Sequence, residues 1–233
     1  MEAKEFFSSE RIVKIHKAVQ CFHPHKTVSA FNAQHLLGLM ASTTVVMLHA
    51  RLKMRLLQAW FLSQFDPMGD NPTKCLRVPR ELVNQLTWWT SMDNLSSGRP
   101  VAQPHPSIQV TTDTSPLGWG AYCQELQMHG LWTQRERMLH INQIEMLTII
   151  NAFRAFLPRL EGKTVQLVTD NTMATHYVKR QGGTHSLPLL NLTIEFWEWC
   201  YAHHIFPRAI HISSEDNYLV DHLSRLPTQI HEW

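Results

Sequence analysis

Four acidic residues in the second half of the chain have the side chains that a metal-dependent hydrolase needs: Asp113, Glu145, Asp170 and Asp221. Two carboxylates about 4 Å apart repel each other by roughly 4 kcal/mol at an effective dielectric near 20, so a cluster of four needs cations. Two Mg²⁺ ions, or Mn²⁺ as the alternative, would offset the charge, and both ions prefer oxygen ligands. A pair of such ions about 3.5–4 Å apart suits attack of water on a phosphodiester. The question is whether the fold gathers these four residues.

The elements that must position the acids are short strands and amphipathic helices, which follow residue 107 in the order βββαβααβα. The expected strands cover 108–114, 118–124, 127–132, 165–169 and 208–212, and the expected helices cover 143–157, 172–180, 188–203 and 216–226. Tight turns predict that the first three strands are antiparallel, and a helical crossover predicts that the last two are parallel to the first. The expected fold class is therefore α/β, a mixed five-stranded sheet of three antiparallel and two parallel strands, flanked by helices.

This order of elements places the acids. Asp113 and Asp170 end the first and fourth strands, which are neighbours in such a sheet, so both would lie at one edge. Glu145 is expected in the first turn of a helix that Asn142 caps, and Asp221 lies on the last helix.

A smaller, mainly helical region is expected before the sheet. Apolar residues at helical spacing predict a helix over 10–20 capped by Ser9, two helices within 28–65 that separate near Gly38 and 42–44, and a helix over 79–93. Gly98 and three prolines make 96–106 typical of a linker. The predicted organisation is a helical region at 1–95, a Pro-rich linker at 96–106, the sheet domain at 107–227 and a tail at 228–233.

Charge is unevenly spread along the chain. Residues 1–106 contain 12 Lys and Arg against 7 Asp and Glu, whereas residues 107–233 contain 9 against 12. A basic half beside an acidic half predicts nucleic acid as the partner of the N-terminal half, and a chance distribution is the plain alternative. Nothing in the sequence indicates the oligomeric state.

The composition also bears on the compartment. No apolar run is long enough to cross a bilayer, and residues 1–5 lack the apolar core of a signal peptide, so no membrane association is expected. Cys21, Cys75, Cys123 and Cys200 are widely spaced and form no Cys-x-x-Cys pair, which indicates free thiols in a reducing compartment. The expectation is an intracellular protein, cytoplasmic or nuclear.

Four short segments contain the acids and the residues around them. They read Thr-Asp-Thr-Ser-x-x-Gly-Trp-Gly-Ala at 112–121, Asn-x-x-Glu-Met-Leu at 142–147, Val-Thr-Asp-Asn at 168–171, and His…Asn…Asp-x-Leu-Ser-Arg within 211–225. Together they resemble type-1 ribonuclease H, particularly that of retrotransposon reverse transcriptase polyproteins of the DIRS type, where a loop like Arg-Gln-Gly-Gly-Thr at 180–184 is also typical. The resemblance covers about residues 107–227. It implies a ribonuclease H-like fold and hydrolysis of the RNA strand of RNA–DNA hybrids.

The resemblance also implies catalytic roles, residue by residue. The metal-binding set of that family is matched by Asp113, Glu145, Asp170 and Asp221. His211 stands where the family has a mobile histidine that assists product release or proton transfer.

Substrate contacts follow in the same way. Asn142 matches a residue that reads the 2′-hydroxyl of RNA in the minor groove. Thr184 and Ser186 lie between a Gly-Gly turn and a helix, where hydroxyls and backbone N–H groups could hold a phosphate of the DNA strand. Four further residues of the matching motifs are expected to contact the substrate: Thr114, Ser115, Asn171 and Asn217.

Residues 1–95 resemble more loosely the thumb and connection region that precedes ribonuclease H in those polyproteins. The matching pieces are Leu-Leu-Gly at 36–38, Arg-Leu-Leu-Gln at 55–58 and Trp88-Trp89. The paired aspartates of a polymerase occur nowhere in the chain, so no polymerase activity is expected. We interpret the chain as a fragment, or as a derived gene that kept only the rear of a reverse transcriptase.

Two departures from the family pattern support a second hypothesis. Ser213-Ser214 stands where Pro-Gly is usual, and Val220 stands where a small Ala is usual. With the missing polymerase, they favour a catalytically silent nucleic-acid-binding or protein-interaction module derived from a reverse transcriptase. A third alternative, an integrase or exonuclease of the wider superfamily, fits less well because the motifs around Glu145 and Asp221 are those of ribonuclease H.

Overall fold

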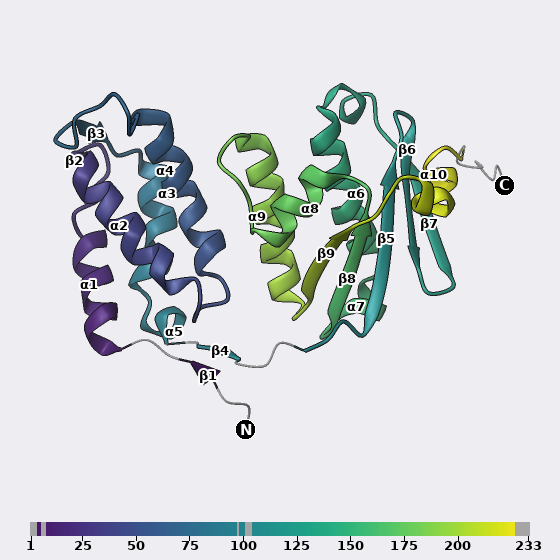
Figure 1. The fold of residues 1–233 in the computed structure, drawn as a ribbon, viewed down its shortest axis with the longest axis horizontal. Coiled ribbons are helices and arrows are strands. Elements are labelled where there is room, and N and C mark those ends of the chain that lie inside the picture. Colours follow the sequence, from purple (N-terminus) through teal and green to yellow (C-terminus); the bar gives the residue numbers. More distant parts are fainter. Residues whose placement is uncertain (1–3, 6–7, 97, 101–103, 227–233) are drawn as a thin grey trace. The chain divides into compact units, whose positions relative to one another are not determined.

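A computed structural model describes residues 4–5, 8–96, 98–100 and 104–226 of the chain (Figure 1). The chain divides into two compact units, residues 1–103 with 183–185, and residues 104–182 with 186–233. The predicted tail at 228–233, and residues 97 and 101–103 of the predicted linker, lie outside the described residues.

The first unit is mainly helical and contains two short antiparallel strand pairs. One pair joins β1 (Lys4–Glu5) to β4 (Arg99–Pro100), and the other joins β2 (Thr27–Ser29) to β3 (Cys75–Arg77). The helices are α1 (Ser9–Val19), α2 (Ala30–Thr43), α3 (Ala50–Gln64), α4 (Arg80–Leu86) and α5 (Met92–Leu95), with a 3₁₀ turn η1 at Thr87–Thr90.

Helix boundaries in this unit differ from the prediction where caps decide them. α2 runs through Gly38 without a break and starts where Ser29 accepts from the backbone N of Asn32 at 3.2 Å. Ser8 rather than Ser9 is the N-cap residue of α1. The helix predicted over 79–93 is split into α4, η1 and α5, with Ser91 capping the last piece.

Fully buried apolar side chains, among them Leu36, Met40, Leu57 and Trp89, form the core of the first unit. Trp89 therefore serves packing rather than base stacking, because no part of its ring faces solvent. No helix among the described residues is both long and apolar enough to cross a membrane.

The second unit contains a five-stranded sheet in the order β7-β6-β5-β8-β9. The strands are β5 (Ile108–Thr114), β6 (Gly118–Cys123), β7 (Leu126–Leu131), β8 (Thr164–Thr169) and β9 (Phe206–His211). β5, β6 and β7 pair antiparallel, whereas β8 is parallel to both β5 and β9. The predicted mixed sheet of three antiparallel and two parallel strands is confirmed.

Helices flank this sheet (Figure 1). The first group consists of α6 (Ile141–Ala155), α8 (Thr172–Lys179) and α9 (Leu187–Ala202), which contact one another and the strands β5, β6, β8 and β9. α10 (Tyr218–Ser224) instead contacts β5, β6 and β7. The remaining pieces are α7 (Leu157–Leu160) and the 3₁₀ turns η2 (Glu136–Met138) and η3 (Glu215–Asn217).

The helix that contains Glu145 starts earlier than predicted and has a different cap. α6 begins at Ile141, and His140 is its N-cap: the ring Nδ1 accepts from the backbone N of Asn142 at 3.2 Å, while Oε1 of Gln143 accepts from the backbone N of His140 at 3.3 Å. The assignment of Asn142 as the cap was therefore wrong, because a histidine ring nitrogen can take the place of the usual Ser, Thr, Asn or Asp oxygen. Glu145 consequently lies in the second turn rather than the first.

The last strand also starts earlier than predicted. β9 begins at Phe206 and includes Pro207, which an edge strand tolerates because one side of its backbone needs no partner. The helix predicted over 216–226 is divided into η3 and α10, and α10 ends at Ser224.

Candidate active site

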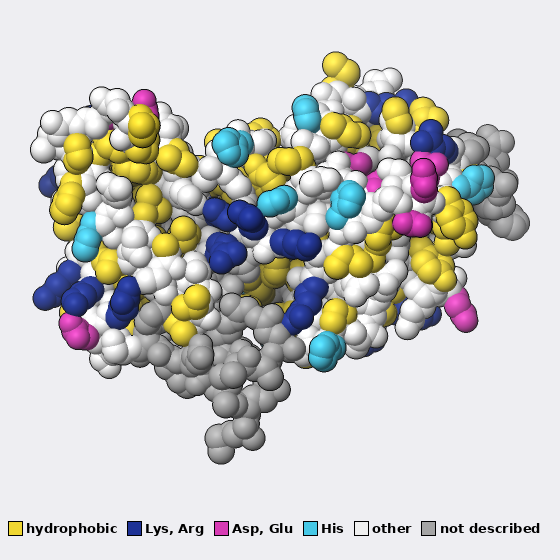
Figure 2. Space-filling model, viewed as in Figure 1, with side chains coloured by type: hydrophobic (Ala, Val, Ile, Leu, Met, Phe, Trp, Pro, Cys, Tyr) yellow, Lys and Arg dark blue, Asp and Glu magenta, His cyan; other side chains and the backbone are white. Residues whose placement is uncertain are grey.

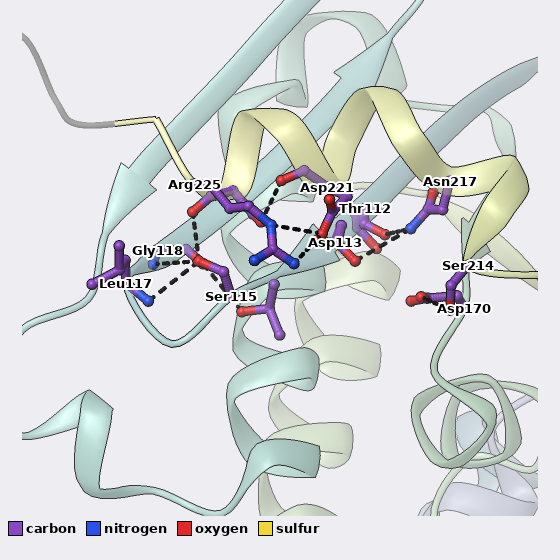
Figure 3. Close-up of polar contacts among 12 residues, drawn as sticks. Thr112, Asp113, Ser115, Leu117, Gly118, Asp170, Ser214, Asn217, Asp221 and Arg225 are labelled. Atoms are coloured by element: carbon purple, nitrogen blue, oxygen red, sulfur yellow. Dashed lines mark hydrogen bonds and ion pairs between the residues drawn. The ribbon is translucent and has the colours of Figure 1, made fainter.

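Asp113 lies near the end of β5, the central strand of the sheet. It pairs with Gly120 of β6, and residues directly opposite in two strands point to the same face. The side chain is only 5% exposed. The Nδ2 group of Asn217 donates to Asp113 Oδ1 at 3.4 Å and to the backbone oxygen of Thr112 at 3.2 Å (Figure 3). Among the described residues, no donor reaches Asp113 Oδ2, which is buried.

A glycine lets α10 lie close against this face. A Cβ atom at Gly120 would stand 2.6 Å from the backbone oxygen of Val220 and 2.7 Å from the backbone N of Ser224, distances that a real side chain does not adopt. The hydroxyl of Ser115 also donates to the backbone oxygen of Ser224 at 2.7 Å, which ties the end of α10 to the turn after β5. The glycine and the serine together place the acid of α10 beside the acid of β5.

Asp170 follows β8, the parallel neighbour of β5. The register pairs Thr111 with Val168, and Asp113 and Asp170 each stand two residues further along. Because parallel neighbours run in the same direction, both acids lie at the same edge of the sheet. Asp170 is half-buried, and the hydroxyl of Ser214 donates to its Oδ2 at 2.7 Å (Figure 3).

Glu145 projects from α6 and is buried, with 7% exposure. In the described part of the chain, its Oε2 has no hydrogen-bond partner. Burial is the main reason that the pKa of Glu145 is raised to about 8, and the negative charges of Asp113 and Asp170 raise it further. A hydrogen bond from Asn171 opposes this rise in pKa. The glutamate therefore lies within electrostatic reach of two of the other acids.

Asp113 shows the same effect. Burial raises the pKa of its carboxyl to about 6, and the charges of Asp170 and Asp221 add to the rise. A hydrogen bond from Ser224 and, to a smaller extent, the guanidinium of Arg225 oppose the rise. The two buried acids thus link all four: Glu145 interacts with Asp113 and Asp170, and Asp113 interacts with Asp170 and Asp221. The four predicted acids therefore lie at one end of the sheet within electrostatic reach of at least one other, without forming a closed cluster.

Asp221 forms an ion pair that was not predicted from the sequence. Its Oδ1 accepts from Nη2 of Arg225 at 2.6 Å and from Nε at 3.0 Å (Figure 3). Asp221 lies on α10 and Arg225 is its C-cap residue, four positions later, a spacing that brings side chains together and that could have revealed the pair. Both side chains are substantially exposed, so this ion pair is worth at most about 1 kcal/mol.

The residues present fit a hard divalent cation. Two buried carboxylate oxygens, on Asp113 and Glu145, have no hydrogen-bond donor among the described groups, and such oxygens are the ligands that Mg²⁺ and Mn²⁺ prefer. As the described side chains stand, no three of them from His, Cys, Asp or Glu are close enough to share one ion. This holds for Asp113, Glu145 and Asp170 as well as for Asp221, which is paired with Arg225, so the side chains would have to move to complete a site.

Three residues predicted to contact the substrate make side-chain hydrogen bonds within the protein. The Ser115 hydroxyl is buried in its turn, where it accepts from the backbone N of Leu117 and of Gly118 at 3.2 Å. Thr114 Oγ1 donates to the backbone oxygen of Gly118 at 3.3 Å. Asn217 is 2% exposed and orients Asp113. Of the three, Asn217 contacts one of the acids, and a contact between any of them and a substrate stays a prediction.

Other predicted residues lie nearer the surface. His211 is exposed, and its ring Nε2 donates to the backbone oxygen of Asp170 at 2.9 Å. Asn142 is half-buried beside the start of α6, and Asn171 caps α8 because its Oδ1 accepts from the backbone N of Ala174 at 2.8 Å.

The two residues predicted to hold a phosphate are assigned to different units. Thr184 belongs to the stretch 183–185 of the first unit. Ser186 belongs to the second unit, where its Oγ caps α9 by accepting from the backbone N of Leu189 at 3.4 Å. Their joint role stays a prediction.

No protein-family model matches the chain, and neither does any curated protein. Twenty-three chains of solved structures do match. One is LC11-RNase H1, isolated from compost by a metagenomic approach and solved in complex with RNA/DNA hybrid, with 14% identity over 50% of this chain and 93% of that chain, at a TM-score of 0.44. Another is RNase H1 from the halophilic archaeon Halobacterium salinarum NRC-1, with 14% identity over 50% and 92% of the two chains, at a TM-score of 0.41.

The foamy viral protease-reverse transcriptase in complex with RNA/DNA hybrid also matches. It shares 12% identity over 97% of this chain and 29% of its own, at a TM-score of 0.33. Identities and TM-scores this low carry no function over to this chain. The functional conclusion has to come from the site itself.

Proposed function

We propose that this chain hydrolyses the RNA strand of RNA–DNA hybrids at a site for two Mg²⁺ ions held by Asp113, Glu145, Asp170 and Asp221. The observation that carries the proposal is the buried pair, Asp113 and Glu145, each with a carboxylate oxygen that no described donor reaches. An ionised carboxylate in such a place is costly unless a cation binds it. Mn²⁺ is the alternative ion.

The roles of the chain's own residues follow from their contacts. When bound, the two ions would activate a water molecule and stabilise the leaving oxygen. Asp113 and Glu145 would bind the ions through their unpartnered oxygens. The Nδ2 group of Asn217 holds the Asp113 carboxylate in place by donating to Asp113 Oδ1. His211, exposed beside Asp170, is proposed for proton transfer or product release.

Recognition of the hybrid is assigned to residues around the acids. Asn142 lies three residues before Glu145 on α6 and is proposed to contact the 2′-hydroxyl, the group that distinguishes RNA from DNA. Thr184 and Ser186 are proposed to contact a phosphate of the DNA strand. The further proposed contacts are Thr114, Ser115, Asn171 and Asn217.

Basic side chains of the first unit are proposed to bind the nucleic-acid backbone. α1 contributes Arg11, Lys14 and Lys17, and Figure 2 shows Lys and Arg side chains over this helix. Lys14 also pairs with Glu10 at 2.7 Å. Binding of this kind weakens steeply with salt, because it releases counterions. The proposed origin of both units is a DIRS-like retrotransposon reverse transcriptase.

The proposal is tested by incubating the full chain with a labelled RNA–DNA hybrid and Mg²⁺. We expect cleavage of the RNA strand, no cleavage of single-stranded RNA or duplex DNA, and loss of activity in Asp113→Asn. Asp216→Asn is the matched control, since Asp216 is an exposed acid of η3 outside the four. Absence of cleavage by the wild type, or cleavage that persists in Asp113→Asn, would overturn the proposal.

A second candidate function is a catalytically silent nucleic-acid-binding or interaction module. It is favoured by the ion pair between Asp221 and Arg225, which leaves the fourth acid turned to a guanidinium. Saturable binding of the hybrid without turnover at any Mg²⁺ or Mn²⁺ concentration would support this candidate over the nuclease.

A further inference from the structure

The last residue of β9 and the connection from β9 to η3 each contact Asp170 once. The backbone N of Ile212 donates to the backbone oxygen of Thr169 at 3.1 Å, which continues the pairing of β8 with β9. The His211 ring then donates to the backbone oxygen of Asp170 at 2.9 Å, and the Ser214 hydroxyl donates to its Oδ2 at 2.7 Å. His211 therefore holds the main chain of Asp170, and Ser214 holds its side chain.

The two serines of the connection, Ser213 and Ser214, make different hydrogen bonds. Among the described residues, the side chain of Ser213 contacts Asp216: its hydroxyl donates to Asp216 Oδ2 at 2.6 Å and accepts from the backbone N of Asp216 at 3.3 Å. This closes a local turn before η3. Ser214, one residue later, reaches across to the end of β8 and contacts an acid 44 positions away in the sequence.

The chemistry of the Ser214 contact suits a group that orients a metal ligand. An O–H donor to a carboxylate makes a short, charge-assisted bond that fixes the rotation of the carboxylate. It uses one oxygen of Asp170 and leaves the other for an ion. Neither proline nor glycine has a side-chain donor, so the Pro-Gly that the serines replace could not make this contact.

We propose that Ser214 is a positioning residue that holds Asp170 in the orientation needed to bind a divalent cation. The inference rests on the proposed function, because it requires the four acids to hold an ion. Hydrogen-bond partners behind a metal ligand typically contribute about 10- to 100-fold to metal affinity. Because Ser214 is exposed at the surface, we expect the lower end of this range.

The test measures Mn²⁺ binding to the full chain without nucleic acid, by electron paramagnetic resonance of the free ion. We expect Ser214→Ala to raise the Mn²⁺ dissociation constant by about tenfold. Ser214→Thr keeps a hydroxyl and should retain the wild-type affinity. Ser213→Ala is the matched control: it removes a neighbouring hydroxyl that contacts none of the four acids, so its affinity should equal that of the wild type.

A second measurement distinguishes a specific effect on ion binding from a general loss of structure or activity. In hybrid cleavage, Ser214→Ala should raise the Mg²⁺ concentration for half-maximal activity, whereas kcat at saturating Mg²⁺ and KM for the hybrid stay close to the wild-type values. Equal or tighter Mn²⁺ binding by Ser214→Ala, or an equal loss in Ser213→Ala, would overturn the inference.

Failure of the inference and failure of the proposed function give different results. If the wild type binds Mn²⁺ and cleaves the hybrid while Ser214→Ala behaves identically, only the role of Ser214 is lost. If the wild type neither binds Mn²⁺ nor cleaves, the nuclease proposal and the role of Ser214 both fall.

Discussion

The four acids of the site form two pairs that differ in their surroundings. Asp113 and Glu145 are 5% and 7% exposed, each has an oxygen without a described partner, and their pKa values are raised to about 6 and about 8. Asp170 and Asp221 are half-buried and have partners, the Ser214 hydroxyl and the Arg225 guanidinium. We call the first the buried pair and the second the outer pair.

This difference indicates which of the acids would need a cation. The outer pair is partly solvated and hydrogen-bonded, so its charge costs little in the absence of an ion. The buried pair has lost its water and gained mutual repulsion, and a cation is what would relieve both costs. In the proposed site, the buried pair would therefore have the greater need of an ion, and the outer pair would complete the site.

The largest expected effect on stability comes from Glu145→Gln, which removes the charge of one member of the buried pair. Because the folded protein holds the proton of Glu145 up to about pH 8 while the unfolded chain releases it near 4.5, stability falls as the pH rises through this window. At about 1.4 kcal/mol per pH unit, the upper limit is about 5 kcal/mol at pH 8. We expect Glu145→Gln to abolish cleavage, yet to stabilise the metal-free protein at pH 8 and change little at pH 5.

Calorimetric unfolding in EDTA at both pH values checks this prediction. Glu125→Gln, which changes an exposed glutamate in the turn between β6 and β7, is the matched control and should leave stability and cleavage unchanged. Glu145→Gln that is no more stable than the wild type at pH 8 would mean that the buried pair is not strained by its charge.

The next effect is stabilisation by the ion itself. A site-bound ion stabilises the folded state by about 2.7 kcal/mol at a free concentration one hundred times its dissociation constant. We expect Mg²⁺ to raise the Tm strongly at pH 8 and much less at pH 5, because protons compete for Asp113 and Glu145 at the lower pH. Asp113→Asn should lose most of the rise at pH 8. An equal rise in Tm in the wild type and in Asp113→Asn would indicate nonspecific binding.

Gly120→Ala moves Asp221 of the outer pair relative to the buried pair. The new Cβ would collide with backbone atoms of α10, which cannot move as a flexible side chain can. We expect a destabilisation of about 1–3 kcal/mol, as for other overpacked positions, together with weaker Mn²⁺ binding. The matched control is Gly38→Ala in α2, where nothing lies within 4 Å of the new atom and a gain of up to about 1 kcal/mol is expected. Urea unfolding curves of the two variants decide between these outcomes.

The smallest effect is expected from Arg225→Ala, which frees Asp221. An exposed ion pair is worth about 1 kcal/mol at most, so we expect Mn²⁺ affinity to rise by no more than about fivefold and stability to fall by less than about 1 kcal/mol. Arg154→Ala, which removes an exposed ion pair with Glu195 at 2.8 Å, controls for stability. A loss of Mn²⁺ affinity in Arg225→Ala would show that the guanidinium supports the site instead of competing with the ion.

Much of the second unit was predictable because local signals and long-range order agree there. The alternation of β5, β6 and β7 with tight turns predicts an antiparallel meander, and a helix between strands predicts a parallel crossover. Signals were weaker in the first unit, where β2 and β3 each have only three residues and one buried side chain. The cap of α6 was missed because a histidine acceptor lies outside the usual cap preferences.

The sequence by itself determined which residues are available for chemistry, and the order of the strands and helices on which they lie. Only the tertiary structure decided which acids are buried and which partners hold them. Asn217 and Asp113 are 104 positions apart, and Ser214 and Asp170 are 44 apart, so no local pattern contains either contact. Burial and hydrogen bonding depend on which distant segments pack together, and these two properties set the charge state that a cation would meet.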